Sequence, residues 1–415
     1  MADAVDGLID AAEASRRLGV QRSTLYAYVS RGRINRHRRE GDRGSWFDPA
    51  EIAGVRHGGP TPPGLELAVT TSITRIAGDR LWYRGLEAAT LAHTVPFESV
   101  CSLLWQGTLE SAPFAAPATT VDVVGRAVAL LGPEARLIDR LGVAVAVAAS
   151  ADPLRFDLSP AAVADSGRRL IATLVASIPP RQATIPELRL GDGVRRRDSV
   201  AARLWTRLAP GPIDGGVAAL NAVLIALADH ELATSTLAAR VAASTRANPY
   251  AAVSAALGVF DGPLHGTVSE EVVALLADAA RRGPAAALAD HLRRGRATPG
   301  FGHRVYRNAD PRAGLILDLL EPLTSATRAS RTRAARSRLD TVFAVHDVAV
   351  AKSTTFPNSD FALGALTYVT GMEADAGEAI FAIARVAGWI AHTLEEYGAA
   401  PLRFRSRAVY TGAEP

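Results

Sequence analysis

The sequence is most informative at Gly300-Phe301-Gly302-His303-Arg304-Val305-Tyr306-Arg307-Asn308-Ala309-Asp310-Pro311-Arg312, where one imidazole and three guanidinium groups share a short segment. Gly300 and Gly302 permit backbone conformations that other residues avoid, and Pro299 disfavours helix in the residue before it. We therefore expect His303 on an irregular loop. Arginine binds carboxylates and phosphates through paired hydrogen bonds. The segment indicates a site for an anionic, carbonyl-bearing substrate; the alternative is a polar loop with solvated arginines.

Three other segments strengthen this interpretation because of their order along the chain. They are Ala228-Asp229-His230-Glu231, Gly262-Pro263-Leu264-His265-Gly266 and Pro357-Asn358-Ser359-Asp360-Phe361. Together with the first segment they resemble the motifs of citrate synthases, in the same order, and the resemblance runs from about Leu65 to Gly412. It implies a mainly α fold with a large and a small helical domain, the small domain spanning roughly residues 267–370.

The resemblance also implies the chemistry. Forming a carbon–carbon bond from a thioester needs a base, a donor for the enol or enolate, and an acid for the acceptor carbonyl. Asp360 would take a methyl proton from acetyl-CoA, His265 would hydrogen-bond the thioester oxygen, and His303 would polarise the oxaloacetate carbonyl and protonate the alkoxide. Ser235 would fix the tautomer of His265. Taken singly, His265 could be a structural imidazole and Asp360 a helix cap.

Substrate anchoring follows from the same resemblance, since a keto diacid needs several donors for its carboxylates. Residues that match the family's oxaloacetate ligands are His230, Arg312, Arg385 and Arg405. In this family the last arginine reaches the neighbouring subunit's site, which implies a homodimer. CoA contacts are implied at Arg307 and at the backbone of Gly300 and Gly302. The cosubstrate would be acetyl-CoA, with no permanently bound cofactor and no metal.

The acyl donor stays open because the chain departs from the family pattern. His265-Gly266-Thr267-Val268-Ser269-Glu270 stands where the family commonly has His-Gly-Gly-Ala-Asn-Glu, and Ala233 replaces a frequent asparagine. A reshaped pocket could favour propionyl-CoA, which would yield 2-methylcitrate. One extra methyl group is worth only about 1 to 3 kcal/mol of discrimination.

A basic segment precedes the synthase-like part. Between Ala14 and Gly44 there are nine arginines and two acids, a local charge of +7 in a chain of net charge +4. Residues 58–65, rich in Gly and Pro, form a linker before residues 66–415. Helical spacing over Ile9–Leu18, a break at Gly19 and an N-cap at Ser23 predict helix, turn, helix.

Residues 11–29 resemble the helix-turn-helix of MerR-like and excisionase-like DNA-binding domains, which implies such a domain over residues 1–57 and a hairpin wing over residues 34–47. Residues expected to contact DNA, at the start of the second helix and on the wing, are Gln21, Arg22, Ser23, Thr24, Arg36 and Arg38. The alternative is a small helical domain that only adds solubility or packs on the enzyme. A rival for the whole chain is a transcription regulator that senses oxaloacetate or acyl-CoA with little turnover.

Composition fits a large intracellular enzyme. The chain has 415 residues, 48% of them apolar, enough for more than one core. Cys101 is the single cysteine, so no internal disulfide forms and a cytoplasmic location is expected. The longest apolar run, residues 217–228, is shorter than the roughly 20 residues that span a bilayer, so no membrane association is expected. Helix is expected over residues 376–396, and extended structure only near residues 121–124 and 71–76.

Overall fold

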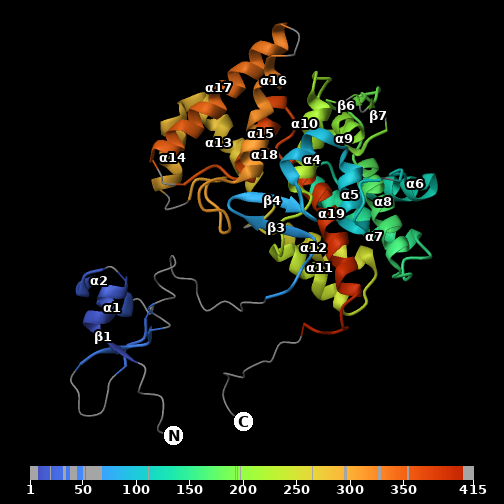
Figure 1. The fold of residues 1–415 in the computed structure, drawn as a ribbon. Helices are drawn as coiled ribbons and strands as arrows, with labels where there is room; N and C mark the ends of the chain where they lie inside the picture. The colour runs from blue at the N-terminus through green and yellow to red at the C-terminus, as the bar shows by residue number, and fades with distance from the viewer. Residues whose placement is uncertain are drawn as a thin grey trace. The chain divides into compact units, whose positions relative to one another are not determined.

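The computed structural model describes residues 8–18, 20–30, 34–37, 44–49, 52, 68–110, 112–191, 193, 195–196, 198–263, 265–293, 297–325, 329–352 and 355–404. The chain folds as two compact units, Met1–Val69 and Thr70–Pro415. Each unit is built around elements of its own. Figure 1 shows the ribbon with its helices and strands labelled.

The first unit has a small core between two helices and a strand pair. Its elements are β1 (Ile9–Asp10), α1 (Ala11–Leu18), α2 (Arg22–Ser30) and β2 (Trp46–Phe47). β1 pairs antiparallel with β2, and His37 forms an isolated antiparallel bridge to Trp46. The buried apolar residues of this core are Ala11, Ala14, Leu25, Ile34, Phe47 and Ile52.

Two sequence-based predictions in this unit were wrong in detail. Ile9 and Asp10 form a strand, and helix α1 begins only at Ala11, with Asp10 Oδ1 accepting the Glu13 N–H at 2.8 Å as a cap does. Helix α2 begins at Arg22, so Ser23 lies inside its first turn and is not the N-cap. Arg38 lies outside the described residues, and so does the side chain of Ser23.

The second unit opens with a three-stranded antiparallel sheet and continues as helices. The sheet consists of β3 (Thr74–Ala77), β4 (Arg80–Tyr83) and β5 (Leu86–Glu87). The helices that follow, up to residue 260, are α4 (Ala88–Thr94), α5 (Phe97–Gln106), α6 (Ala118–Ala129), α7 (Leu137–Ala151), α8 (Pro160–Ser177), α9 (Val200–Leu208), α10 (Gly216–Leu227), α11 (Thr234–Ser244) and α12 (Pro249–Phe260). A short strand pair, β6 (Leu188–Arg189) with β7 (Arg195–Arg196), precedes α9.

The remaining helices include the centre of the fold. They are α13 (Val268–Arg282), α14 (Pro284–Arg293), α15 (Pro311–Asp318), α16 (Leu320–Ser325), α17 (Ala329–Lys352), α18 (Ser359–Thr370) and α19 (Ala376–Tyr397). α19 is buried along nearly its whole length and contacts α5, α7, α8, α10, α11 and α12. Its charged residues Glu378, Arg385, His392 and Glu396 are buried together with its apolar ones, so α19 lies in the interior. The helix expected over residues 376–396 is therefore confirmed.

Helices α13 to α18 form a second group, drawn in yellow to orange in Figure 1, with α17 lying along α14 and α16. α13 and α18 also contact α19, so this group meets the central helix directly. Among the described residues no helix combines the length and hydropathy needed to cross a membrane.

Tight turns shape the sheet that opens this unit. Gly78 and Asp79 both have positive φ between β3 and β4, and Arg84 and Gly85 do so between β4 and β5. Two-residue turns of this kind match the twist of paired strands. The extended structure expected near residues 71–76 is found in part, as β3. The expectation for residues 121–124 was wrong, because they lie within α6, where Val124 is buried as part of a helix face.

Candidate active site

Two segments 56 residues apart in sequence pair to form the base of the site. Gly300 O accepts the Asn358 N–H at 2.8 Å, Gly302 N donates to Phe356 O at 2.8 Å, and Asn358 Nδ2 donates to Gly302 O at 2.8 Å. Gly300 has φ +78°, and a Cβ there would lie 2.6 Å from Cβ of Phe361. Only glycine fits such a close approach. The pairing brings the His303 loop to the start of α18, where Asp360 lies.

Asn358, not Asp360, caps α18. Its side chain accepts hydrogen bonds from the backbone N–H groups of Asp360 and Phe361. The interpretation of Asp360 as a helix cap is therefore wrong, and its carboxyl group is left for another purpose.

Asp310 ties the same two segments together a second time. Its carboxylate caps α15, accepts the Ser359 N–H at 3.0 Å, and binds the Arg312 guanidinium through Nε at 2.9 Å and Nη2 at 2.7 Å. Burial acts to raise the pKa of Asp310, but the charge and hydrogen bonds of Arg312 lower it overall. This paired contact fixes the direction of a buried guanidinium.

Three aromatic rings gather in front of that guanidinium. The ring of His303 lies 5.2 Å from that of His230 and 4.8 Å from that of Tyr306, between centroids. His230 Nε2 lies 3.1 Å from the Tyr306 hydroxyl. Burial and the charges of Arg312 and Arg385 hold the pKa of His230 well below its usual range. His230 is therefore uncharged beside two cations.

Backbone donors decide the tautomer of His303. Its Nδ1 accepts the Val305 N–H at 3.0 Å, so the ring proton is on Nε2. Nε2 also lies 3.3 Å from Arg312 Nη2, but Arg312 can only donate, so the protonated Nε2 makes no hydrogen bond to it. Burial and the Arg312 charge lower the pKa of His303 to about 4. The Nε2–H group is thus free to donate to an incoming oxygen.

His265 is held by α11 and α19. Its Nε2 lies 2.9 Å from Ser235 Oγ, which accepts the Trp389 Nε1–H at 3.3 Å. The Ser235 hydroxyl can then donate to Nε2, which leaves Nδ1 as the donor of the ring. Burial and the Arg385 charge lower the pKa of His265 to about 4. The geometry includes the Ser235 contact that was expected.

The Asp360 carboxyl group is desolvated, and within the described part of the chain it lacks a partner on one oxygen. The residue is half-buried, but its Oδ1 is covered and has no hydrogen-bond partner among the described residues. Burial raises the pKa of Asp360 to about 6, although Arg312 and Arg385 act against this. A carboxylate that is desolvated and unpaired gains basicity.

Arg385 on α19 connects these groups. Its Nε donates to Leu227 O at the end of α10 at 2.9 Å, its Nη2 has no partner among the described residues, and it is 1% exposed. Its charge acts on Asp360, His265 and His230. A buried guanidinium with an unused donor is suited to bind an anion.

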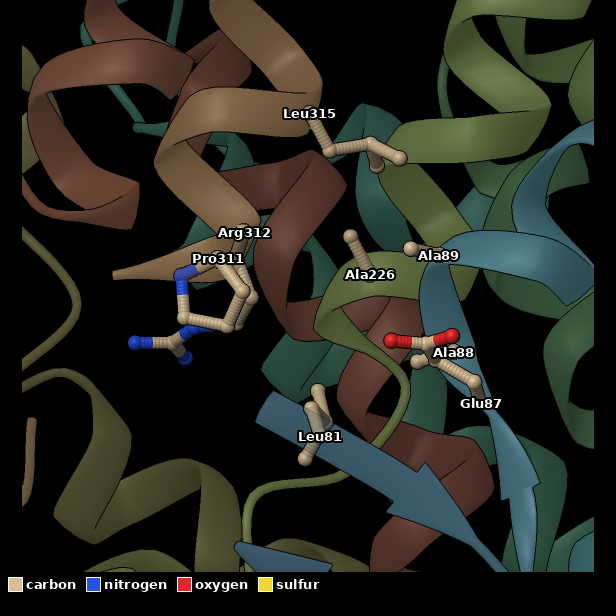
Figure 2. Close-up of a pocket in the computed structure, with 8 residues that line it drawn as sticks. All are labelled: Leu81, Glu87, Ala88, Ala89, Ala226, Pro311, Arg312 and Leu315. Atoms are coloured by element: carbon tan, nitrogen blue, oxygen red, sulfur yellow. The ribbon is translucent and has the colours of Figure 1, made fainter. Parts of the chain in front are cut away.

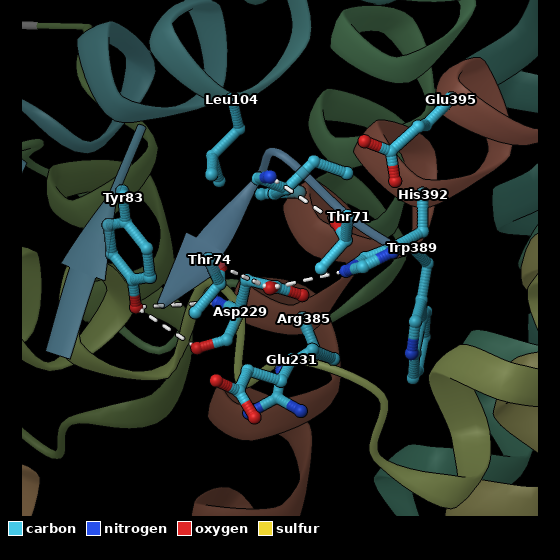
Figure 3. Close-up of polar contacts among 12 residues, drawn as sticks. Thr71, Thr74, Tyr83, Leu104, Asp229, Glu231, Arg385, Trp389, His392 and Glu395 are labelled. Carbon is cyan, nitrogen blue, oxygen red and sulfur yellow. Dashed lines mark hydrogen bonds and ion pairs between the residues drawn. The ribbon is translucent and has the colours of Figure 1, made fainter. Parts of the chain in front are cut away.

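The turn that carries His230 is clamped by the β3–β4 hairpin (Figure 3). The Tyr83 hydroxyl donates to Ile225 O at 2.9 Å, Thr74 Oγ1 donates to Asp229 Oδ2, and Glu231 Oε1 accepts the Ile76 N–H at 2.9 Å. The hairpin tip also reaches the His303 loop, because the Asp79 carboxylate accepts the backbone N–H groups of Arg307 and Asn308 at 3.0 and 3.2 Å.

A small pocket lies beside Arg312 (Figure 2). Its lining is mostly apolar: Leu81, Glu87, Ala88, Ala89, Ala226, Pro311, Arg312 and Leu315. It lies between β4, β5, α4, α10 and α15, and of the expected site residues only Arg312 lines it.

The remaining expected site residues are the CoA contacts Arg307, Gly300 and Gly302 and the substrate ligand Arg405. The Arg307 side chain is exposed, and Gly300 and Gly302 use their backbone groups for the pairing with residues 356–358. Their contacts with CoA stay predictions. Arg405 lies outside the described residues. No three His, Cys, Asp or Glu side chains within the described ranges gather as a metal site would require.

Sequence reasoning missed several residues that hold the site. Asp310 had a usable signal, since an acid before Pro311 marks a helix start. Asp229 stood next to His230 in a recognised segment. Tyr83 stood in Tyr83-Arg84-Gly85-Leu86, which also resembles the family, but Thr74 and Asp79 had no signal, because their contacts join residues far apart in the chain.

Comparisons with known proteins agree with this geometry. The family model for the citrate synthase C-terminal domain matches residues 64–407. Citrate synthase 2 of Bacillus subtilis is 30% identical over 369 residues, covering 85% of this chain and 96% of that protein. 2-Methylcitrate synthase 1 of Corynebacterium glutamicum is 31% identical over 373 residues, covering 83% and 93%. The citrate synthase of Thermoplasma acidophilum, solved with carboxymethyl coenzyme A and oxaloacetate, has a TM-score of 0.67 and 25% identity, with 85% and 95% covered.

Proposed function

The chain belongs to the citrate synthase family, and on that premise we propose that it condenses acetyl-CoA with oxaloacetate to give citrate and CoA. The observation that carries the proposal is Asp360: an unpaired carboxylate of raised pKa, on which two arginine charges act, next to a loop that holds an uncharged histidine donor. This set suits proton abstraction next to a carbonyl and addition to a second carbonyl.

The proposed steps follow from the donors and acceptors present. Asp360 takes a proton from the acetyl methyl group while His265 Nδ1–H donates to the thioester oxygen. The enol carbon attacks the oxaloacetate ketone, and His303 Nε2–H donates to the oxygen that becomes the alkoxide. Water then hydrolyses the citryl thioester. His230, Arg312 and Arg385 bind the carboxylates, and Arg405 would join them from the neighbouring subunit of a homodimer.

The test is release of free thiol from acetyl-CoA in the presence of oxaloacetate. Wild-type protein should turn over, and Asp360→Ala should lose activity by about a thousandfold or more with an unchanged circular dichroism spectrum. An active Asp360→Ala variant would contradict the assignment of the base.

Propionyl-CoA belongs in the same assay, because relatives of similar identity are named for citrate and for 2-methylcitrate. A higher kcat/KM with acetyl-CoA would identify the reaction as citrate synthesis, and a higher kcat/KM with propionyl-CoA as 2-methylcitrate synthesis.

DNA binding by the first unit is the second candidate. Gln21 and Arg22 are exposed at the start of α2, and Arg36 is exposed before the bridge to β2. Exposed donors at a helix start, in a basic segment, suit contact with phosphates and bases. Binding to DNA fragments should weaken steeply with salt and vanish when residues 1–57 are removed. Absent or salt-independent binding, together with turnover, would leave the chain an enzyme only.

A further inference from the structure

A row of buried charged residues runs from the site to the last described segment and has no part in the proposed steps. Arg240 on α11 is 1% exposed, and His392 and Glu396 on α19 are fully buried. Arg240 Nε donates to Glu396 Oε2 at 3.1 Å, and its Nη1 donates to Glu395 Oε2 at 2.7 Å and lies 2.8 Å from His392 Nδ1. A buried charge is costly without a partner, so the loss of one member of this row would leave its neighbours in the row unpaired.

At its inner end the row meets the turn that carries His230 (Figure 3). Because Arg240 can only donate, His392 Nδ1 accepts and its Nε2–H donates to Asp229 Oδ2 at 3.3 Å. Burial acts to raise the pKa of Asp229, but His392, Arg385 and Thr74 lower it overall. A Cβ on Gly388 of α19 would lie 2.2 Å from Asp229 Oδ1. Asp229 is thus a buried anion whose charge acts on Arg385, a proposed substrate ligand.

At its outer end the row holds the segment that leaves α19. Arg403 donates to both oxygens of Glu396, from Nε and Nη2 at 2.6 Å each. Nearby, Leu402 N donates to Ser244 O at 2.8 Å, and Arg246 donates to the carbonyls of Tyr397 and Ala399 at 2.8 Å. Without Arg403, Glu396 Oε1 would lose this partner.

We propose that Arg403, Glu396 and Arg240 are positioning residues that anchor this carboxyl-terminal segment and couple it to the Asp229–Arg385 end of the keto diacid site. The inference rests on the proposed function, since the coupled ligand is its oxaloacetate. Direct contacts link Arg403 to Asp229 through Glu396, Arg240 and His392, so loosening the outer end also loosens the surroundings of Arg385. A substrate binds more tightly to a ligand that is already held in position.

The experiment compares Arg403→Met with Arg181→Met in the full chain. Arg181 is a matched control: its side chain is 39% exposed against 31% for Arg403, but its partner Glu373 is 69% exposed whereas Glu396 is 0%. Hydrogen exchange is followed at residues 398–404, oxaloacetate binding by calorimetry, and kcat and KM by thiol release. Arg403→Met should speed exchange and weaken oxaloacetate binding about tenfold or more, with kcat within about threefold. Arg181→Met should match wild type.

Arg403→Lys provides a rescue test. It keeps the charge but not the two-pronged contact, so its exchange and its oxaloacetate Kd should fall between those of wild type and Arg403→Met. Exchange and Kd of Arg403→Met within about twofold of wild type would overturn the inference. If wild-type protein bound oxaloacetate but released no thiol, the proposed function would be overturned. The comparison of oxaloacetate Kd values would then still test whether Arg403 acts as an anchor.

Discussion

Asp360 shows how one residue can be costly for stability and useful for chemistry. Its Oδ1 is covered without a partner among the described residues, and burial raises its pKa to about 6. Removing such a group removes an uncompensated desolvation cost. We expect Asp360→Ala to unfold at the same temperature as wild type or higher, measured by thermal denaturation, while activity is lost. A clear fall in Tm would show that the carboxylate contributes to stability.

The pH dependence of activity should report the same carboxylate. The base must be deprotonated, so a pKa of about 6 means that kcat/KM rises about tenfold per pH unit below 6 and levels off above about 7. His265 and His303 have pKa values lowered to about 4, by burial and by the neighbouring arginines, and stay uncharged across this range. Thiol release measured from about pH 5 to 8 checks this. A flat profile over the lower half of that range would contradict it.

Ser235 affects the reaction through His265. Its Oγ lies 2.9 Å from His265 Nε2. A hydrogen bond donated by Ser235 to Nε2 leaves His265 Nδ1 as the donor of the ring. Ser235→Ala should lower kcat about tenfold, because a lost hydrogen bond of this kind is worth about 1 to 2 kcal/mol. The KM for oxaloacetate should change little. Thr234→Ala, on the exposed neighbouring residue, is the control and should keep wild-type kcat.

At the scale of elements, the pairing of residues 300–302 with 356–358 decides whether the site exists. Gly300→Ala would place a Cβ 2.6 Å from Phe361 Cβ at a backbone φ of +78°. We expect a loss of about 2 to 4 kcal/mol of unfolding free energy, from strain and overpacking together, and a large fall in kcat. Denaturant unfolding measures the first and thiol release the second.

Gly314 offers the matched control within α15. A Cβ there meets nothing within 4 Å and its φ is not positive, so Gly314→Ala should stabilise the protein by up to about 1 kcal/mol through helix propensity. If Gly300→Ala and Gly314→Ala changed the unfolding free energy and kcat equally, the loop would not depend on the close approach of Gly300 to Phe361.

At the scale of the whole molecule, the division of the chain predicts independence of the reaction from the first unit. Among the described residues, the core around Leu25 and Phe47 is made of side chains between residues 9 and 52, and all proposed catalytic residues lie beyond Thr70. A chain of residues 68–415 should therefore fold and release thiol with kcat within about twofold of the full protein. A truncated chain that folds but is inactive would assign a catalytic role to the first unit.

The amino-acid sequence by itself determined the helical class, the family and the segments that carry the chemistry. These are local signals: glycines around His303, an amphipathic period at residues 376–396, and four short segments in a fixed order. What only the tertiary structure decided is how these side chains are held. The Asn358 pairing, the two-pronged Asp310–Arg312 contact and the Arg240–His392–Asp229 row depend on atoms brought together by packing. Neither propensity nor periodicity encodes such contacts, because their free energy exists only once the helices are in place.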